Sequence, residues 1–270
     1  MSTLKTPLRY PGGKSRAMKN LGKYIPRDIK RFHEPFLGGG SIALWVTQNI
    51  PDADIWVNDL YVNLFYFWTE LKQDPSFLVN ELTKIKDDIK DDPEKGKQKF
   101  YEMKEKIKNA TPFFSAVYFF ALNKMSFSGL GESSGFSAMA LKSNFSYRSI
   151  DVLPEYSALI QKWKITNLDY TQLYSDDPDT LIILDPPYQI ESFLYGKGGN
   201  HHRGFDHDKF AKECCRAKAK QLITYNSSEI IKSKFPDWEK IEWDLTYTMR
   251  SDEKYTKAQK KRKELILKNY

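Results

Sequence analysis

Residues Leu181-Ile182-Ile183-Leu184-Asp185-Pro186-Pro187-Tyr188 decide the fold of this 270-residue chain. The first four are apolar and rich in β-branched side chains, a short run that is typical of a buried parallel strand. The two prolines then end the strand, because neither has a backbone N–H that could continue the ladder. We therefore expect Asp185 and Tyr188 at the carboxyl edge of a sheet, where open α/β sheets bind their ligands.

The same segment suggests what kind of group binds there. A carboxylate and a peptide carbonyl can accept the two N–H bonds of a planar amine, and an aromatic ring can pack against its face. Asp185, the following carbonyls and Tyr188 supply these three features. The exocyclic amino group of a nucleobase fits such a pocket.

A glycine turn on the N-terminal side indicates a second ligand-binding segment. An expected strand at 31–34 leads into Phe36-Leu37-Gly38-Gly39-Gly40, after which helical spacing begins. Glycines at such a turn permit positive φ and let a ligand approach the backbone closely. Asp59 ends a further expected strand at 54–58. A carboxylate there accepts ribose hydroxyls in nucleotide-binding folds, and the alternative is an Asp that caps the next helix.

Strand and helix patterns alternate along most of the chain. The other expected strands lie at 163–168, 220–225, 240–245 and 264–267. Such alternation predicts an α/β fold with a mostly parallel sheet and helices on both faces. The middle third interrupts it, so we expect a catalytic domain from 1–59 and 163–270 with a mainly helical inserted domain at 60–162.

Composition restricts the class of protein. The formal net charge is +7, which suits a polyanionic partner, although charge alone does not decide the matter. No stretch approaches the roughly 20 apolar residues that span a bilayer, and residues 1–5 lack the apolar core of a signal peptide. We therefore expect a cytoplasmic protein without a membrane partner. The adjacent Cys214 and Cys215 argue against a disulfide framework and a zinc site.

Two other patterns need separate interpretation. Gly13-Lys14-Ser15 resembles the end of a phosphate-binding loop, but that motif requires a glycine where Leu8 stands. Lys14 can instead hold a ligand carboxylate as a point charge, or lie in a surface turn. We expect 189–208 to be a mobile loop that closes over the substrates. Its histidines form no known zinc signature, so we expect no metal site; they are His201, His202 and His207.

Four segments in order identify a family. They are R-Y-P-G-G-K at 9–14, E-P-F-L-G-G-G-S at 34–41, V-N-D-L at 57–60 and D-P-P-Y at 185–188. Together they resemble the Dam-type (D12 class, group alpha) DNA adenine-N6 methyltransferases, which use S-adenosylmethionine. Each motif alone is common, but four in this order cover nearly the whole chain. The resemblance implies a Rossmann-like methyltransferase sheet with an inserted target-recognition domain, and site-specific methylation of double-stranded DNA.

The resemblance also assigns residues to the reaction. The catalytic pocket is implied to consist of Asp185, Pro186, Pro187 and Tyr188. The cofactor is implied to contact Tyr10, Lys14, Phe36, Gly38, Gly39, Gly40, Asp59, Asp169 and Asp185. For Asp169 the alternative is a simple turn at the end of a strand. A target adenine must leave the duplex to reach such a pocket, and Tyr188 is then expected to stack on it.

The insert is implied to read the DNA. Residues 123–130, N-K-M-S-F-S-G-L, resemble the N-(K/R)-x-x-(Y/F)-N-G-L segment of the recognition region. Ser128 replaces the usual asparagine, and no arginine-bearing segment follows, which argues against the target GATC. The expected DNA contacts are Lys124, Ser126, Ser128, Asn144 and Arg148. For any one of them the alternative is that it only packs the insert against the core.

Other activities remain open from sequence alone. An amino-methyltransferase acting on RNA or on a protein glutamine usually carries N-P-P-Y and lacks the G-G-K motif. Cytosine-N4 enzymes typically have serine where Asp185 stands. An inactive DNA-binding relative is a third alternative, which the intact catalytic and glycine motifs oppose. The resemblance leaves a cognate restriction endonuclease open as a partner.

Overall fold

A computed structural model describes residues 3–10, 12–188, 205–244 and 263–270, and its centre is a seven-stranded sheet. The strand order is β3-β2-β1-β4-β5-β7-β6. All pairs from β3 to β5 are parallel, whereas β7 runs antiparallel to both β5 and β6. The strands are β1 (Arg31–Glu34), β2 (Asp54–Asn58), β3 (Lys164–Thr166), β4 (Thr180–Leu184), β5 (Lys220–Asn226), β6 (Glu239–Asp244) and β7 (Lys263–Lys268).

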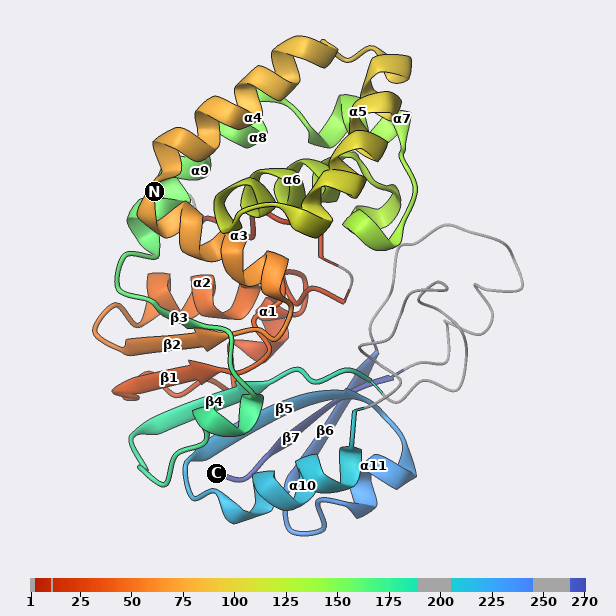
Figure 1. Cartoon of the computed structure of the whole chain (residues 1–270). Helices are drawn as coiled ribbons and strands as arrows, with labels where there is room; N and C mark the ends of the chain where they lie inside the picture. Colours follow the sequence, from red (N-terminus) through yellow and green to blue (C-terminus); the bar gives the residue numbers. More distant parts are fainter. Residues whose placement is uncertain (1–2, 11, 189–204, 245–262) are drawn as a thin grey trace.

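Helices cover both faces of the sheet, as the sequence predicts (Figure 1). The helices α1 (Met18–Leu21) and α2 (Ser41–Asn49) lie on one face, and α10 (His207–Arg216) and α11 (Glu229–Ser233) lie on the other. The central strand β4 is buried along its whole length. Its side chains alternate between the two layers, since Leu181 and Ile183 belong to one apolar cluster and Ile182 and Leu184 to the other.

The middle of the chain forms the expected helical insert between β2 and β3. Its helices are α3 (Val62–Gln73), α4 (Pro75–Ile89), α5 (Pro93–Lys106), α6 (Pro112–Met125), α7 (Ala138–Asn144), α8 (Tyr147–Asp151) and α9 (Leu153–Leu159). Three of them, α4 to α6, begin with proline directly after an Asp or Thr whose side chain accepts a backbone N–H of the first turn. That pairing satisfies orphan donors and presets the first φ angle, so it fixes where each helix starts.

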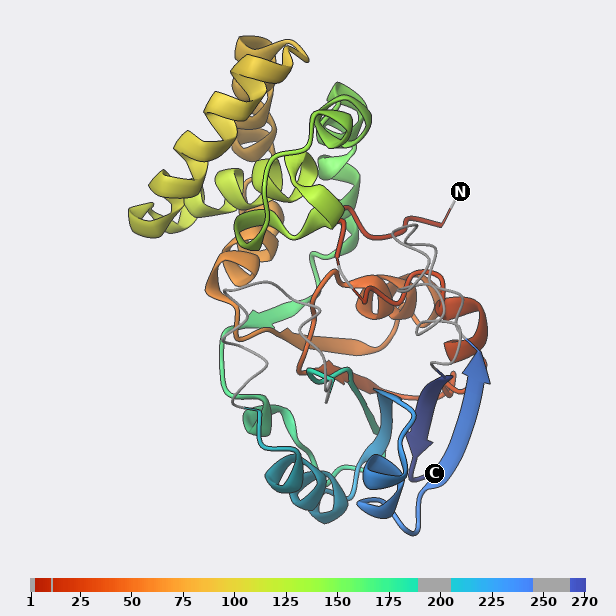
Figure 2. The same ribbon diagram turned by 90° about the vertical axis from the view of Figure 1, so that its right-hand side faces the viewer.

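The insert stands on the α2 side of the sheet (Figure 2). Its buried side chains, among them Phe67, Trp68 and Phe120, belong to the same apolar cluster as Phe32 and Ile183 of the sheet. The division into a catalytic and a target-recognition domain stays a prediction, because one continuous core runs through both parts.

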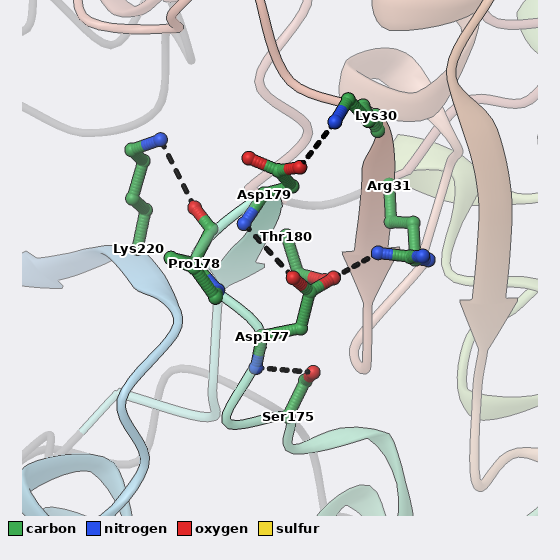
Figure 3. Close-up of polar contacts among 8 residues, drawn as sticks. All are labelled: Lys30, Arg31, Ser175, Asp177, Pro178, Asp179, Thr180 and Lys220. Carbon is green, nitrogen blue, oxygen red and sulfur yellow. Dashed lines mark hydrogen bonds and ion pairs between the residues drawn. The ribbon is translucent and has the colours of Figure 1, made fainter.

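Charged residues hold the amino ends of the parallel strands together (Figure 3). The Asp177 carboxylate accepts hydrogen bonds from Asp179 N at 3.1 Å and Thr180 Oγ1 at 2.8 Å, and it pairs with Arg31 of β1. Lys220 of β5 donates to the Pro178 carbonyl at 3.0 Å. This polar network lies at the start of β4. It is therefore at the edge of the sheet opposite to the carboxyl ends of β1, β4 and β5.

Candidate active site at the carboxyl edge of the sheet

Asp185 follows directly after β4 and is held from two sides. Thr224 Oγ1 on the neighbouring strand β5 donates to Oδ1 at 2.5 Å, and Lys14 Nζ lies 2.8 Å from Oδ2. Thr224 is fully buried, and the Asp185 side chain keeps 23% of its surface exposed. A carboxylate has about four lone-pair positions. Thr224 and Lys14 therefore fix the orientation of the Asp185 carboxylate, and its exposed side can still accept further hydrogen bonds.

Lys14 connects the two ends of the Asp-Pro-Pro-Tyr segment. Besides Asp185, its ammonium contacts the Tyr188 hydroxyl at 2.9 Å and donates to the Gly12 carbonyl at 3.1 Å. These bonds use all three N–H donors of the lysine. The side chain is only 6% exposed. The structure thus places Lys14, which sequence reasoning assigned to the cofactor, against the predicted base pocket.

Tyr188 has a second polar contact and an aromatic neighbour. Its hydroxyl donates to Glu264 Oε2 of β7 at 2.8 Å. Its ring lies 5.9 Å from that of Tyr225 on β5, centroid to centroid. His207, which lies in α10, contacts the Tyr225 hydroxyl through Nδ1 at 2.8 Å. Burial lowers the pKa of His207, so the neutral ring is favoured there.

The glycine turn after β1 is shaped by two aromatic side chains. Gly38 and Gly40 have φ of +50° and +69°. A Cβ on Gly38 would lie 2.9 Å from the Tyr10 ring, and one on Gly40 would lie 2.7 Å from the Trp68 ring. The backbone conformation and these close approaches therefore both require glycine. Tyr10 also packs on Gly39, so this tyrosine and the turn form one surface, and their contact with the cofactor stays a prediction.

Asp59 holds the turn from the next strand. Its Oδ2 accepts the backbone N–H of Gly38 at 2.9 Å, and its Oδ1 accepts that of Tyr61 at 2.9 Å. The second bond closes a short turn before α3, whose N-cap is Tyr61, so Asp59 does not cap that helix as the alternative interpretation expected. Asp59 is partly exposed, which is compatible with the expected contact with ribose hydroxyls.

A second carboxylate, Glu34, lies beneath the turn at the end of β1. It is 2% exposed, and Oε2 accepts the backbone N–H of Ala43 in α2 at 2.9 Å. Burial raises its pKa well above the usual value, and the negative charges of Asp185 and Asp59 add to that rise. Glu34 therefore ties the turn to the helix that follows it, and the protonated form is favoured.

Aromatic rings line the same edge near β3. Phe36 stacks on Tyr170 with centroids 5.3 Å apart, and both rings contact Phe205 and Phe210. Asp169, the neighbour of Tyr170, is exposed and accepts the backbone N–H of Thr171 at 3.0 Å. Its side chain therefore caps a local turn, which was the alternative for this residue.

The recognition segment of the insert is bonded to the first motif of the chain. Asn123 Oδ1 accepts Arg9 N at 3.0 Å, and its Nδ2 donates to Arg9 O and Gly129 O, both at 2.8 Å. Arg9 in turn donates to the Ser126 carbonyl at 2.9 Å. A Cβ on Gly129 would lie 2.2 Å from Arg9 O, so only glycine permits this contact. The predicted DNA-reading segment and the predicted pocket are thereby fixed relative to each other.

Three of the expected DNA contacts line one cavity. Lys124, Asn144 and Arg148 border a cavity of about 290 Å³, together with Ser146 and Ser149. None of its lining residues is acidic. Lys124 is 9% exposed and has no hydrogen bond or carboxylate partner in the part of the chain that the structure describes. Burial, and less strongly Arg9, lower the pKa of Lys124 to about 8.

The other two expected contacts differ in accessibility. Ser126 is fully buried, and its hydroxyl accepts Gly131 N at 2.8 Å while donating to Asn123 O at 3.3 Å. We therefore withdraw Ser126 as a DNA contact, because its side chain shapes the loop from within. Ser128 is half-buried with φ of +54°. Asparagine, usual there in relatives, tolerates that conformation better than serine does.

Some of the residues for which the sequence gives a prediction lie outside the part of the chain that the structure describes. Residues 189–204 of the closing loop predicted over 189–208, with His201 and His202, fall outside the described residues, whereas His207 and Asp208 begin α10 and so are not part of a loop. Within the described ranges, no three His, Cys, Asp or Glu side chains gather as a metal site would require. The helices in those ranges are also too short or too polar to cross a bilayer.

Sequence reasoning missed three residues of this site. Glu34, Thr224 and Glu264 are all polar residues that lie buried in strands. For Thr224 and Glu264 the signal is a polar residue beside the apolar run of a strand, because a buried carboxylate or hydroxyl needs a partner. The β1 sequence R-F-H-E has only one apolar residue and gives no such signal for Glu34. The identity of the partner depends on the strand order, which no single segment reveals.

The chain is similar in sequence to known DNA methyltransferases. The family described as D12 class N6 adenine-specific DNA methyltransferase matches residues 10–249. The type II methyltransferase M.MjaIII of Methanocaldococcus jannaschii is 25% identical over 204 residues, covering 67% of this chain and 68% of that protein. The type II methyltransferase M.CviBI of Paramecium bursaria Chlorella virus NC1A is 20% identical over 274 aligned positions, covering 99% and 100% of the two chains.

Proposed function

The chain belongs to the D12 class N6 adenine-specific DNA methyltransferase family, and we propose that it is a site-specific enzyme acting on a flipped-out adenine of double-stranded DNA. The cofactor proposed is S-adenosylmethionine, in keeping with the family. The observation that carries the proposal is the Asp185 carboxylate at the carboxyl edge of β4, oriented by Thr224 and Lys14 and still partly exposed.

The residues around the glycine turn fit that cofactor by their chemistry. S-adenosylmethionine carries a ribose diol, a charged amino-acid end and an adenine ring, and it supplies an electrophilic methyl group. Asp59 is a partly exposed carboxylate suited to the ribose hydroxyls. The turn from Gly38 to Gly40, against Tyr10, offers a backbone surface to the amino-acid end. The Phe36 and Tyr170 rings provide an apolar face beside them.

The proposed base pocket prepares adenine N6 as a nucleophile. The lone pair of that amino group is delocalised into the ring, which makes it unreactive in the free base. Asp185 and the Pro186 carbonyl accept hydrogen bonds from its two N–H groups, which favours a pyramidal nitrogen whose lone pair faces the methyl donor. The N6 lone pair would then form a C–N bond to the methyl group as the methyl–sulfur bond breaks, and S-adenosylhomocysteine would leave with that electron pair. No covalent enzyme intermediate is needed, and orientation with electrostatic stabilisation supplies most of the rate.

The protein around Asp185 keeps its carboxylate in the required position. Thr224 fixes Oδ1 and Lys14 fixes Oδ2, so little reorganisation is needed when the base enters. Asp185 also stabilises the positive charge that develops on N6 during transfer. The proton released afterwards leaves through Asp185 or water. Tyr188 stacks on the extruded base and offsets part of the flipping cost, which is a few kcal/mol.

The DNA partner is proposed to cross the insert near the cavity of Lys124, Asn144 and Arg148. These side chains present positive charge and hydrogen-bond donors without an acidic neighbour in the cavity lining. Ser128 lies on the adjoining recognition segment. The two named relatives are type II methyltransferases, and on that basis we propose a cognate restriction endonuclease as the functional partner.

The test is methyl transfer by the purified full chain to unmethylated plasmid DNA, with N6-methyladenine measured by mass spectrometry of the digested product. We expect N6-methyladenine from the wild type, and a loss of at least about 100-fold for Asp185→Ala, because the acceptor for the adenine amino group and the charge that pairs with Lys14 are removed together. Matched RNA should stay unmodified. N4-methylcytosine as the product, or full activity of Asp185→Ala, would refute the proposal.

Sequencing of modified bases completes this test. DNA from cells that express the wild-type chain should carry methyladenine within one short recurring sequence, whereas DNA from cells expressing Asp185→Ala should carry none. GATC is not expected, because Ser128 and the segment that follows depart from the relatives that read it. Scattered modification without a common sequence would contradict the site-specific part of the proposal.

A further inference from the structure

We propose that Glu264 is a positioning residue for methyl transfer, which holds the ring of Tyr188 in place through a hydrogen bond to its hydroxyl. The inference rests on the proposed assignment of Tyr188 to the base pocket. Glu264 belongs to β7, at the far end of the sequence from every motif that points to this chemistry. None of the sequence patterns assigns it a role.

The burial of Glu264 requires an explanation. Its side chain is 4% exposed, and it lies in β7 between the exposed Lys263 and three buried apolar residues, Leu265 to Leu267. A buried carboxylate is retained in a protein only when its oxygens have partners. Its Oε2 lies 2.8 Å from the Tyr188 hydroxyl, so the tyrosine is one such partner. The sheet places Glu264 beside Asn226 of β5 and Trp243 of β6, which fixes its backbone from both sides.

The Tyr188 hydroxyl is engaged both as a hydrogen-bond donor and as an acceptor. It donates to Glu264 and accepts from Lys14 at 2.9 Å. Lys14 at the same time contacts Asp185 at 2.8 Å. A continuous polar chain therefore runs from β7 through Tyr188 and Lys14 to the carboxylate of Asp185, which is proposed to accept a hydrogen bond from the adenine amino group.

This arrangement fixes the tyrosine ring before a base arrives. The hydroxyl is held at two points, and the Tyr225 ring lies beside Tyr188 at 5.9 Å. A side chain that is already ordered loses little conformational freedom when a base stacks on it. Glu264 therefore acts on the reaction through Tyr188, without touching the base itself.

The experiment compares Glu264→Met with Glu264→Gln in the full-length enzyme. Methionine fills a similar volume but removes the acceptor, whereas glutamine keeps an oxygen that can accept the tyrosine O–H. We expect Glu264→Met to lower kcat/KM on DNA about 10- to 100-fold, because a hydrogen bond to a charged group is lost. The kcat/KM of Glu264→Gln should stay within about fivefold of the wild-type value. If the negative charge were the feature that matters, glutamine would lower kcat/KM as much as methionine does.

A double-mutant cycle with Tyr188→Phe isolates the contact. Tyr188→Phe removes the hydroxyl and keeps the ring. If Glu264 acts through that hydroxyl, Glu264→Met should cause no further loss in the Tyr188→Phe background. Base flipping gives a second readout, since 2-aminopurine at the mapped target adenine should fluoresce less with Glu264→Met. Cofactor affinity and the thermal midpoint should stay near the wild-type values.

The control is Glu239→Met. Glu239 lies on the neighbouring strand β6 and pairs with Lys268 at 2.7 Å, so its loss removes a carboxylate from the opposite end of the β6–β7 pair. It should leave kcat/KM unchanged. If Asp185→Ala is inactive, full activity of Glu264→Met or additive losses in the cycle would overturn the inference and leave the proposed function intact. Activity of Asp185→Ala would instead refute the proposed function.

Discussion

The ammonium of Lys14 lies 2.8 Å from Asp185 Oδ2 and 2.9 Å from the Tyr188 hydroxyl, so one buried lysine joins the first and last residues of the catalytic segment. We predict that Lys14→Met lowers the single-turnover rate of methyl transfer about 100-fold or more. Removing one member of a buried ion pair costs about 3–5 kcal/mol, because the other charge is left unpaired. Rapid-quench kinetics at saturating cofactor would measure the rate.

Cofactor affinity separates the two roles proposed for Lys14. If it only held the carboxylate of the cofactor, Lys14→Met would weaken cofactor binding and leave the rate at saturation close to that of the wild type. The geometry predicts the opposite pattern, with the rate reduced at every cofactor concentration. Calorimetry without DNA supplies the binding constant, and Lys30→Met, which removes an exposed lysine paired with Asp179, is the control.

The glycine turn gives a prediction about stability. Gly40 has φ of +69°, and an added Cβ would lie 2.7 Å from the buried Trp68 ring. We expect Gly40→Ala to lower the free energy of unfolding by about 2–4 kcal/mol, through backbone strain and overpacking together. Thermal denaturation would show it as a fall in the midpoint, and cofactor binding should weaken with it.

Gly12→Ala is the matched control for that change. Gly12 has a similar φ of +71°, but among the described residues no heavy atom other than those of its chain neighbours lies within 4 Å of the added Cβ. Only the backbone cost of about 1–2 kcal/mol should then appear. Equal destabilisation by the two substitutions would mean that the contact with Trp68 contributes nothing.

The strands were predictable because their signal is local. The apolar run before Asp185, the two prolines and the repeated β patterns lie within a few residues of each other, and all seven strands were anticipated to within about two residues. The glycine turn and the insert could be recognised for the same reason, since Gly38, Gly40 and the change of composition after Asp59 are visible in single segments.

The contacts of the site were less predictable, because they join distant segments. Lys14 suits a ligand carboxylate as well as a protein carboxylate, and only the fold decides for Asp185. Ser126 occupies a motif position next to exposed residues, yet the chain turns it inward, where it bonds Gly131 N. Glu264 depends on β7 lying beside β5, an order that follows from the packing of the whole sheet.

Removal of the Tyr188 ring should affect catalysis on DNA more than cofactor binding. Base–aromatic stacking is worth about 1–3 kcal/mol, so Tyr188→Ala should lower kcat/KM on DNA about 5- to 150-fold. Cofactor affinity measured without DNA should change less than threefold, which corresponds to a free-energy difference of less than roughly 0.6 kcal/mol. Equal losses in both measurements would count against the assignment of this residue to the base pocket.

Lys124 gives a prediction about pH. Burial lowers its pKa to about 8 from an ordinary 10.5, and Arg9 adds to this, while Arg148 lines the same cavity. The charged form should contact a DNA phosphate, so affinity should fall as the pH rises through about 8. Folding stability should change in the opposite direction. Between pH 8 and 10.5 the unfolded chain binds more protons at this residue, so its contribution to stability rises with pH.

Salt titrations of DNA binding, by fluorescence anisotropy, measure the contact directly. At pH 7, Lys124→Met should reduce the slope of log K against log salt by about 0.9, the value for one lost phosphate contact. At pH 10 the variant and the wild type should have nearly the same slope, because the wild-type lysine is then neutral. Lys108→Met removes an exposed lysine that pairs with Glu105, and it should leave the slope unchanged at both pH values. A difference between Lys124→Met and the wild type that persists at pH 10 would show that the lost contact does not depend on the lysine charge.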